Sequence, residues 1–140
     1  MAFYRRSGVR DVRTFNSADT LSANELVQFD EAGEVISAVT GKEVLGVTLQ
    51  SATSADTVLV DCFGTDHELE VTGITGTMAN SEIGNEADII SGGGVAVTAT
   101  LTESNGDILI TGWDGSTTSK LYGKLKNLAF GSPGANVQTT

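Results

Sequence analysis

The most constraining feature of this sequence is a series of short apolar segments separated by glycine-containing turns, within residues 26–49. The apolar segments lie at residues 26–29, 35–39 and 44–49. The connectors between them contain Gly33 and Gly41. Segments of four to six residues rich in Val, Ile, Leu and Phe, bounded by glycine turns, are typical of a β-meander. This stretch therefore predicts three consecutive strands.

The rest of the chain has the same character. It has 140 residues, the size of one domain, with 17 glycines and one proline. Val, Ile and Thr are abundant, and no window repeats apolar residues at helical spacing, so long helices are not expected. Further strands are expected at residues 57–63 and 68–72, the second with Leu69 and Val71 facing the core. We therefore predict an all-β protein.

A second stretch of the chain resembles the first. Residues 24–29 align with residues 85–90 at an offset of 61, and the turn at Gly33 aligns with the glycines at 92–94. After the Asn105-Gly106 turn pair, the offset grows to 64. Internal similarity at about 60 residues predicts two related β-meander units, at about 24–64 and 85–126.

Charge is distributed unevenly along the chain. Residues 1–13 carry a net charge of +3 and residues 120–140 also carry +3, whereas residues 14–119 carry −16. An acidic body of this kind repels nucleic acid and anionic membranes, so neither is expected as a partner. The pattern divides the chain into a basic N-terminal arm (1–20), a β domain (21–126) and a C-terminal tail (127–140).

The basic arm has two interpretations. It is either a solvated, disordered terminus or an extended arm that docks on an acidic partner or a neighbouring subunit. Arginine and aromatic side chains usually carry interface energy, which makes those of this segment the candidate partner-binding residues. They are Phe3, Tyr4, Arg5, Arg6, Arg10, Arg13 and Phe15.

No set of residues predicts a catalytic, metal or cofactor site. The single histidine, His67, is expected on a surface turn, and no nucleophile motif accompanies it. The glycines at 92–94 are not followed by the Lys-Ser/Thr of a phosphate-binding loop. The acidic clusters lack the spacing of a calcium-binding loop. We therefore expect no catalytic residues, no bound metal and no cofactor.

Three further absences exclude classes of protein. Cys62 is the only cysteine, which excludes an intramolecular disulfide and a cysteine-based zinc site, and we expect a buried, inert thiol. No run approaches about 18 consecutive apolar residues, so no membrane-spanning helix is expected. The basic start is not followed by an apolar segment, so it does not read as a signal peptide.

The only tryptophan leaves several interpretations open. Trp113 is followed by Asp114 in a Gly-rich loop. It could stack on a sugar, anchor an interface, or pack on the core at the end of a strand. Trp113 and Asp114 are therefore candidate loop contacts for a receptor or a glycan.

The strands and turns of the first unit together resemble a known family. Residues 26–30 lead through a Gly turn to 34–38, then to Val44-Leu45-Gly46-Val47-Thr48-Leu49, and then to a Val-x-Val strand at 57–61. This order resembles the capsid decoration (cement) proteins of tailed bacteriophages, including lambda-type head stabilisers and related small capsid proteins. The resemblance extends over residues 24–125. The chain lacks the proline-rich N-terminal segment of the lambda-type pattern.

The resemblance implies a fold and a role. The expected fold is all-β, a small β-barrel or β-tulip-like domain built from two meander units with an extended N-terminal arm. The expected role is that of a non-enzymatic virion protein, assembled in the host cytoplasm, that binds the outer surface of the capsid and stabilises contacts between capsomers. Its partners would be the major capsid protein and neighbouring copies of itself, as a trimer or otherwise a dimer. The alternative is a receptor- or glycan-binding β-module of a phage tail or a cell surface.

Overall fold

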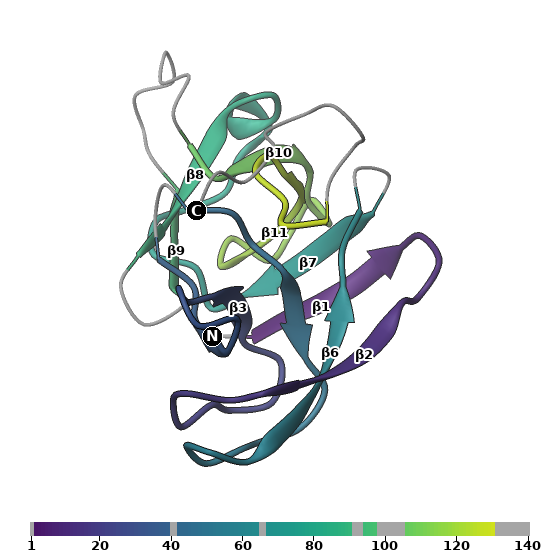
Figure 1. Cartoon of the computed structure of the whole chain (residues 1–140). Coiled ribbons are helices and arrows are strands. Elements are labelled where there is room, and N and C mark those ends of the chain that lie inside the picture. Colours follow the sequence, from purple (N-terminus) through teal and green to yellow (C-terminus); the bar gives the residue numbers. More distant parts are fainter. Residues whose placement is uncertain (1, 40–41, 65–66, 91–93, 98–105, 131–140) are drawn as a thin grey trace.

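A computed structural model describes residues 2–39, 42–64, 67–90, 94–97 and 106–130, and in this part of the chain the protein is all-β, as predicted (Figure 1). One short 3-10 helix, η1 (Asn80–Glu82), joins two strands. The strands are β1 (Ala2–Ser7), β2 (Val12–Asn16), β3 (Leu26–Phe29), β4 (Val35–Ser37), β5 (Gly46–Thr48), β6 (Thr57–Cys62), β7 (Glu68–Thr72), β8 (Glu86–Ile90), β9 (Gly94–Val97), β10 (Ile108–Gly112) and β11 (Lys120–Leu125).

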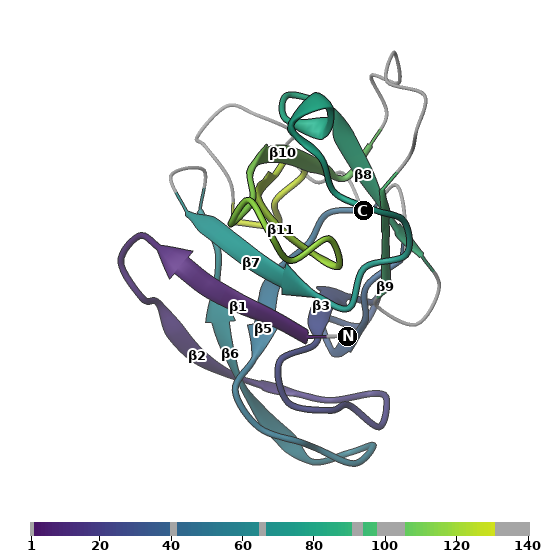
Figure 2. The same ribbon diagram turned by 180° about the vertical axis from the view of Figure 1, so that it is seen from behind.

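The strands form two antiparallel sheets. The first has the order β1-β7-β11-β10-β8-β9, and the second has the order β2-β6-β5-β3-β4. Both views show β1 beside β7 and β2 beside β6, at the ends of the two sheets (Figures 1 and 2). Each sheet ends in edge strands, so the described strands do not close into the barrel that we expected. The turn after β1, where Gly8 has a φ of +99°, carries the chain from the first sheet into the second.

The two halves of the chain share one strand order. Strands β2 to β6 are arranged as β2-β6-β5-β3-β4, and strands β7 to β11 as β7-β11-β10-β8-β9. All of these pairings are antiparallel. The predicted units at 24–64 and 85–126 contain β3–β6 and β8–β11, four strands in the same arrangement. Strand β1 is the additional strand, and it pairs with the outer edge of β7.

Two clusters of buried side chains hold the sheets. The first cluster draws on both sheets, with Phe3, Leu69, Val71 and Leu121 from the first sheet and Val47 from the second. The predicted inward positions of β7 are confirmed, since Leu69 and Val71 are both fully buried. Alternation along a strand places every second side chain on one face, which is why these residues meet in one layer.

The second cluster covers the other face of the second sheet. Val58, Val60 and Cys62 of β6 point into it, together with Val27 of β3. Loop residues close it from outside, among them Leu21. The second sheet is therefore buried on both faces, apart from its exposed edge strand β2.

The predicted N-terminal arm is part of these sheets. Phe3 lies opposite Val71 in the β1–β7 ladder and is 1% exposed, and Arg13 lies opposite Val60 in the β2–β6 ladder. Residues 2–7 and 12–16 are therefore strands of the body and do not form the extended arm that we expected. The sequence does not show this, because the partners of both strands lie more than forty residues away in the sequence. The predicted tail also begins on the body, where Ala129 N–H donates to Val44 O at 2.9 Å. Residues 131–140 lie outside the described residues.

Candidate interaction surface

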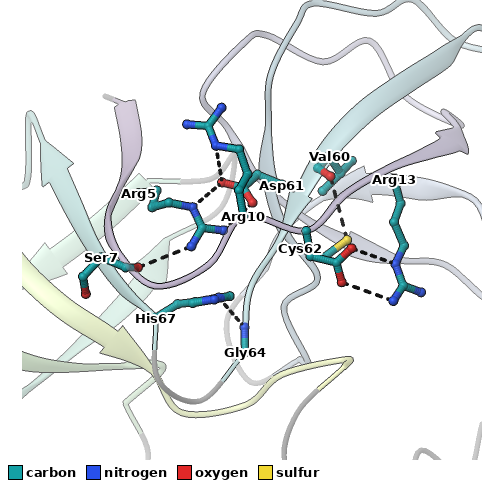
Figure 3. A network of polar contacts seen from close by, with 10 residues as sticks. Arg5, Ser7, Arg10, Arg13, Val60, Asp61, Cys62, Gly64 and His67 are labelled. Carbon is teal, nitrogen blue, oxygen red and sulfur yellow. Dashed lines mark hydrogen bonds and ion pairs between the residues drawn. The ribbon is translucent and has the colours of Figure 1, made fainter.

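The first strand places two of the seven candidate side chains inside the body. Phe3 is 1% exposed in the first core. The Arg5 guanidinium donates to both carboxylate oxygens of Asp61, with Nε at 2.9 Å from Oδ2 (Figure 3). The side chains of Arg5 and Asp61 are only 9% and 2% exposed. Phe3 and Arg5 therefore hold the fold together and are not presented to a partner.

The turn after β1 is fastened to the same carboxylate. Arg10 approaches Asp61 at 3.9 Å from Nε to Oδ2, while its own side chain remains 59% exposed (Figure 3). Gly8 packs so closely on His67 that a Cβ at this position would lie 1.8 Å from the ring. The Arg5 guanidinium also lies over the Phe63 ring, 5.1 Å from its centroid. Two arginines and one buried carboxylate thus join β1 and the turn to β6.

Two more candidates lie on the outer face of the first sheet. Tyr4 is 40% exposed and points away from the core that holds Phe3. Arg6 donates to Glu68 at 2.8 Å and lies over the Tyr122 ring, 3.6 Å from its centroid. Its side chain is 45% exposed. Both residues are accessible, but Arg6 already has a carboxylate and a ring as neighbours.

The last two candidates belong to β2. Arg13 pairs with Asp11 at 3.1 Å and lies 4.8 Å from the centroid of the Phe130 ring. The hydrogen bond and the negative charge of Asp11 raise the pKa of Arg13 above its ordinary value. Phe15 is half-buried and meets Phe29 edge to face at 5.2 Å between centroids. Arg13 is thus exposed beside a small aromatic cluster formed by Phe15, Phe29 and Phe130.

These contacts leave basic and apolar side chains exposed on β2, on the turn before it and at Phe130. Among them Arg13 lies beside Phe130, whereas Val12 points to the other face of the strand. We define the N-terminal surface as Val9, Arg10, Val12, Arg13 and Phe130. Val9 is 81% exposed, Val12 43% and Phe130 40%. Arginine beside exposed apolar side chains is the composition found at protein interfaces. The sequence prediction contained the two arginines of this surface and missed its three apolar members.

The sequence indicates the exposure of the two valines of this surface but not that of Phe130. The stretch Val9-Arg10-Asp11-Val12-Arg13 has no clear alternation of apolar and polar residues, so both valines fall outside a buried face. The position of Phe130 depends on its packing against Phe29, at 5.9 Å between centroids, and on no local pattern.

Trp113 and Asp114 serve the fold in the described structure. Trp113 packs against the first core, and its Nε1–H donates to Asn80 Oδ1 at 2.8 Å. Asp114 Oδ1 accepts backbone N–H groups from Ser116 at 2.8 Å and from Thr117 at 2.7 Å. These hydrogen bonds hold the pKa of Asp114 well below its ordinary value. Of the interpretations of Trp113, packing on the core agrees with these contacts.

The two reactive residue types lie in the interior. His67 is 7% exposed, so the expectation of a surface turn residue was wrong. Its Nδ1 accepts the Gly64 N–H at 2.7 Å (Figure 3). Its ring meets Phe63 at 5.4 Å between centroids. Cys62 is buried, as predicted, and burial is the main cause that raises the pKa of its thiol to about 11. The thiol is therefore protonated at neutral pH and is a poor nucleophile.

The described residues also contain a groove along the β3–β4 hairpin. It has a volume of about 690 Å³ and is lined by Gln28, Phe29, Asp30, Glu31, Gly33, Ile36 and Lys42. Asp30 Oδ1 already accepts the N–H groups of Ala32 and Glu34, both at 2.9 Å, so this carboxylate closes the hairpin turn. No pair of these lining residues forms a nucleophile with a neighbouring base.

Among the described residues, no group of three or more His, Cys, Asp or Glu side chains is arranged to hold a metal ion. None of the helices described has the length and apolar character needed to cross a membrane.

Comparison with known proteins identifies a similar fold. No protein-family model matches the chain, and no curated protein sequence matches it. The crystal structure of the head fiber gp8.5 N base of bacteriophage phi29 superposes with a TM-score of 0.58 at 12% sequence identity. The match covers 84% of this chain and 95% of the phage protein chain. The two chains therefore share their fold over almost the whole of the phi29 protein chain.

Proposed function

We propose that this chain is a non-enzymatic structural protein of a phage virion, associated with the head. The observation that carries the proposal is the shared fold with a head fiber base, which spans 95% of that chain. The resemblance of residues 24–125 to capsid decoration proteins, which rests on the sequence alone, supports the same class of virion protein. The buried His67 and the protonated thiol of Cys62 agree with a role without catalysis.

The finer role that we propose is binding to the outer surface of the capsid and stabilisation of contacts between capsomers. The N-terminal surface is the contact we propose, because it presents Arg10 and Arg13 beside exposed Val9, Val12 and Phe130. The chain carries a net charge of −10, whereas Arg10 and Arg13 are balanced here by Asp61 and Asp11, so an acidic patch on the shell would be repelled less by this surface than by the rest of the body. A protein that binds only the assembled shell stabilises that shell by mass action.

The test is binding of the purified protein to empty, expanded capsids of the phage that encodes it. The mixture is separated on a sucrose gradient, and the copies bound per shell and the melting temperature of the shell are measured. We expect a fixed ratio at saturation and a higher melting temperature. Absence of binding to the expanded shell would contradict the proposed role.

Removal of both charges tests the proposed contact surface. We expect the double variant Arg10→Gln/Arg13→Gln, which places no carboxylate beside Asp61, to lose most of the binding while it keeps its fold, measured by circular dichroism. The control is Lys124→Gln, which removes the charge of an exposed basic residue on β11. If the double variant saturates shells as the unchanged protein does, the contact lies on another face, although the head-associated role would stand.

A further inference from the structure

The outer edge of β2 is open in the described part of the chain. Strand β2 is the terminal strand of the second sheet, and its five residues are exposed except for the half-buried Phe15. Both views place it at the periphery of the molecule (Figures 1 and 2). Open edges of this kind are sites at which another strand can be added.

The second half of the chain shows what the same edge looks like when it is filled. In the shared strand order, β2 corresponds to β7, because each is the first strand of its half and pairs with the last strand. The outer edge of β7 is covered by β1, antiparallel, from Ala2 opposite Thr72 to Arg5 opposite Leu69. The corresponding edge of β2 therefore has the position in the fold that receives a sixth strand in the other half.

The direction of the backbone groups of β2 follows from its ladder with β6. Cys62 N–H donates to Asp11 O at 2.8 Å, and Ser17 N–H donates to Asp56 O at 2.7 Å. In an antiparallel ladder the residues that bond to the partner alternate, so Asp11, Arg13, Phe15 and Ser17 bond inward to β6. The N–H and C=O groups of the residues between them point outward. These are Val12, Thr14 and Asn16.

We propose that the edge of β2 binds the β2 edge of a second copy of this chain, antiparallel, about a two-fold axis at Thr14. In this register Thr14 lies opposite Thr14 of the second copy, and Val12 lies opposite Asn16 of the second copy. All three outward residues then form hydrogen-bonded pairs across the axis. The two five-stranded sheets become one continuous sheet, and the contact is isologous.

The side chains of β2 are complementary to themselves in this register. Arg13 lies opposite Phe15 of the second copy, at a non-hydrogen-bonded position where side chains approach most closely. A guanidinium over an aromatic ring is a favourable contact. In this register Arg13 does not lie opposite Arg13 of the second copy, and within its own chain it lies beside Asp11 and the Phe130 ring. Asp11 neutralises Arg13 within each chain at 3.1 Å, so the one charged residue of the strand does not block pairing. The inference depends on the strand order and not on the head-associated role. Because the dimer and the proposed capsid contact share Val12 and Arg13, dimerisation is tested in the absence of capsids.

The first experiment changes the residue on the axis. Molar mass is measured by sedimentation equilibrium over a concentration series for the unchanged protein, Thr14→Lys and the control Thr14→Ser. We expect a monomer–dimer equilibrium for the unchanged protein and the serine variant. Thr14→Lys places two ammonium groups directly opposite each other and should raise the dimer dissociation constant at least about tenfold.

The second experiment detects the pairing covalently and does not depend on the first variant folding. Thr14→Cys is oxidised in dilute solution and analysed without reductant. Paired residues at this kind of position lie about 5.5 Å apart at Cα, within the range that a disulfide spans. The only native cysteine, Cys62, is buried, so it does not compete. We expect rapid formation of a disulfide-linked dimer from Thr14→Cys and slow formation from the exposed control Ser116→Cys.

Each outcome decides the matter. A dimer that Thr14→Lys weakens, with selective cross-linking of Thr14→Cys, supports the proposal. A monomer at every concentration, or an oligomer that Thr14→Lys leaves unchanged, overturns it. Equal cross-linking of Thr14→Cys and Ser116→Cys overturns the register at Thr14.

Discussion

The two halves of the molecule, β2–β6 and β7–β11, have the same strand order but finish their sheets differently. In the second half, β1 pairs with the outer edge of β7, whereas in the first half the edge of β2 is open among the described residues. The N-terminal strand is thus used once, on one of two equivalent edges. The comparison shows that a repeated meander specifies an arrangement of strands and leaves the completion of each edge to residues outside the repeat.

The halves also differ in what covers their faces. The first sheet buries one face, and Tyr4 and Arg6 lie on the other. Apart from its edge strand β2, the second sheet is buried on both faces, since Val47 reaches the first core while Val60 reaches the second. Loop residues such as Leu21 cover the outer face of the second sheet, so its central strands lie between two layers of apolar side chains.

The difference between the edge strands β1 and β2 is tested most directly by substituting the phenylalanine in each. We expect Phe3→Ala to destabilise the protein by about 3–5 kcal/mol, because Phe3 is fully buried in the first core. Phe15→Ala should destabilise it by about 1–1.5 kcal/mol, because Phe15 is half-buried. Chemical denaturation measures both. Equal effects would mean that β1 is no more integral to the body than β2.

The junction between the two sheets depends on a buried ion pair. Asp61→Ala leaves the Arg5 guanidinium, 9% exposed, without its carboxylate and should destabilise the fold by about 3–5 kcal/mol. The control is Asp11→Ala, which removes an exposed partner of Arg13 and should change stability by at most about 1 kcal/mol. Urea denaturation of both variants checks this. A small loss for Asp61→Ala would show that the sheets are held by apolar packing alone.

Each half also has one strand pair in close contact at a glycine. A Cβ at Gly46 would lie 2.0 Å from the backbone oxygen of Asp61, and a Cβ at Gly123 would lie 2.5 Å from Ile108. We expect Gly46→Ala and Gly123→Ala each to destabilise by about 1–3 kcal/mol. Gly112→Ala is the matched control, because its nearest neighbour would be an ordinary 3.7 Å away, and it should change stability by less than about 0.5 kcal/mol. Thermal denaturation ranks the stabilities of the three variants. If Gly112→Ala destabilises the protein as much as the other two, the close approach of the strands is not the cause of the loss.

The smallest effect concerns a turn in the second half. The folded state lowers the pKa of Asp114, so the carboxylate stabilises the fold above the unfolded pKa, about 3.9, and this contribution is lost as the pH falls towards the folded pKa. The melting temperatures of the unchanged protein and Asp114→Ala should therefore converge below about pH 4. Asp114→Asn keeps an acceptor without the charge, so its melting temperature should lie between those of the other two at neutral pH, and its gap to the unchanged protein should also narrow at low pH. A gap for Asp114→Ala that persists to low pH would contradict the role of the ionised carboxylate.

Much of the fold could be predicted from the sequence, because the relevant signals are local. Apolar runs with glycine turns predicted β3 to β6, and alternation in β7 predicted the inward positions of Leu69 and Val71. Strand β1 could not be predicted in this way. Its Arg5 is compatible with a buried strand only because Asp61, 56 residues later, supplies the opposite charge.

The candidate site was predictable only in part, for a related reason. Arginines in the N-terminal segment indicated an interaction surface, but burial divides them into structural and exposed members. Arg5 faces Asp61 in the interior, whereas Arg13 faces solvent beside Phe130. Which arginines are buried depends on contacts between residues far apart in the sequence. The net charge of the segment does not indicate it.

The pairing of β1 with β7 has a consequence for how the chain is synthesised. Ala2 lies opposite Thr72, so the ribosome must add about 70 residues after the first strand before its partner exists. At about 5–20 residues per second, this takes roughly 3 to 14 seconds. During that interval Phe3 and Arg5, both buried in the finished protein, are exposed in the cell. Strand β1 is therefore synthesised well before it can pair, and the nascent chain presents it to chaperones and to other copies in the meantime.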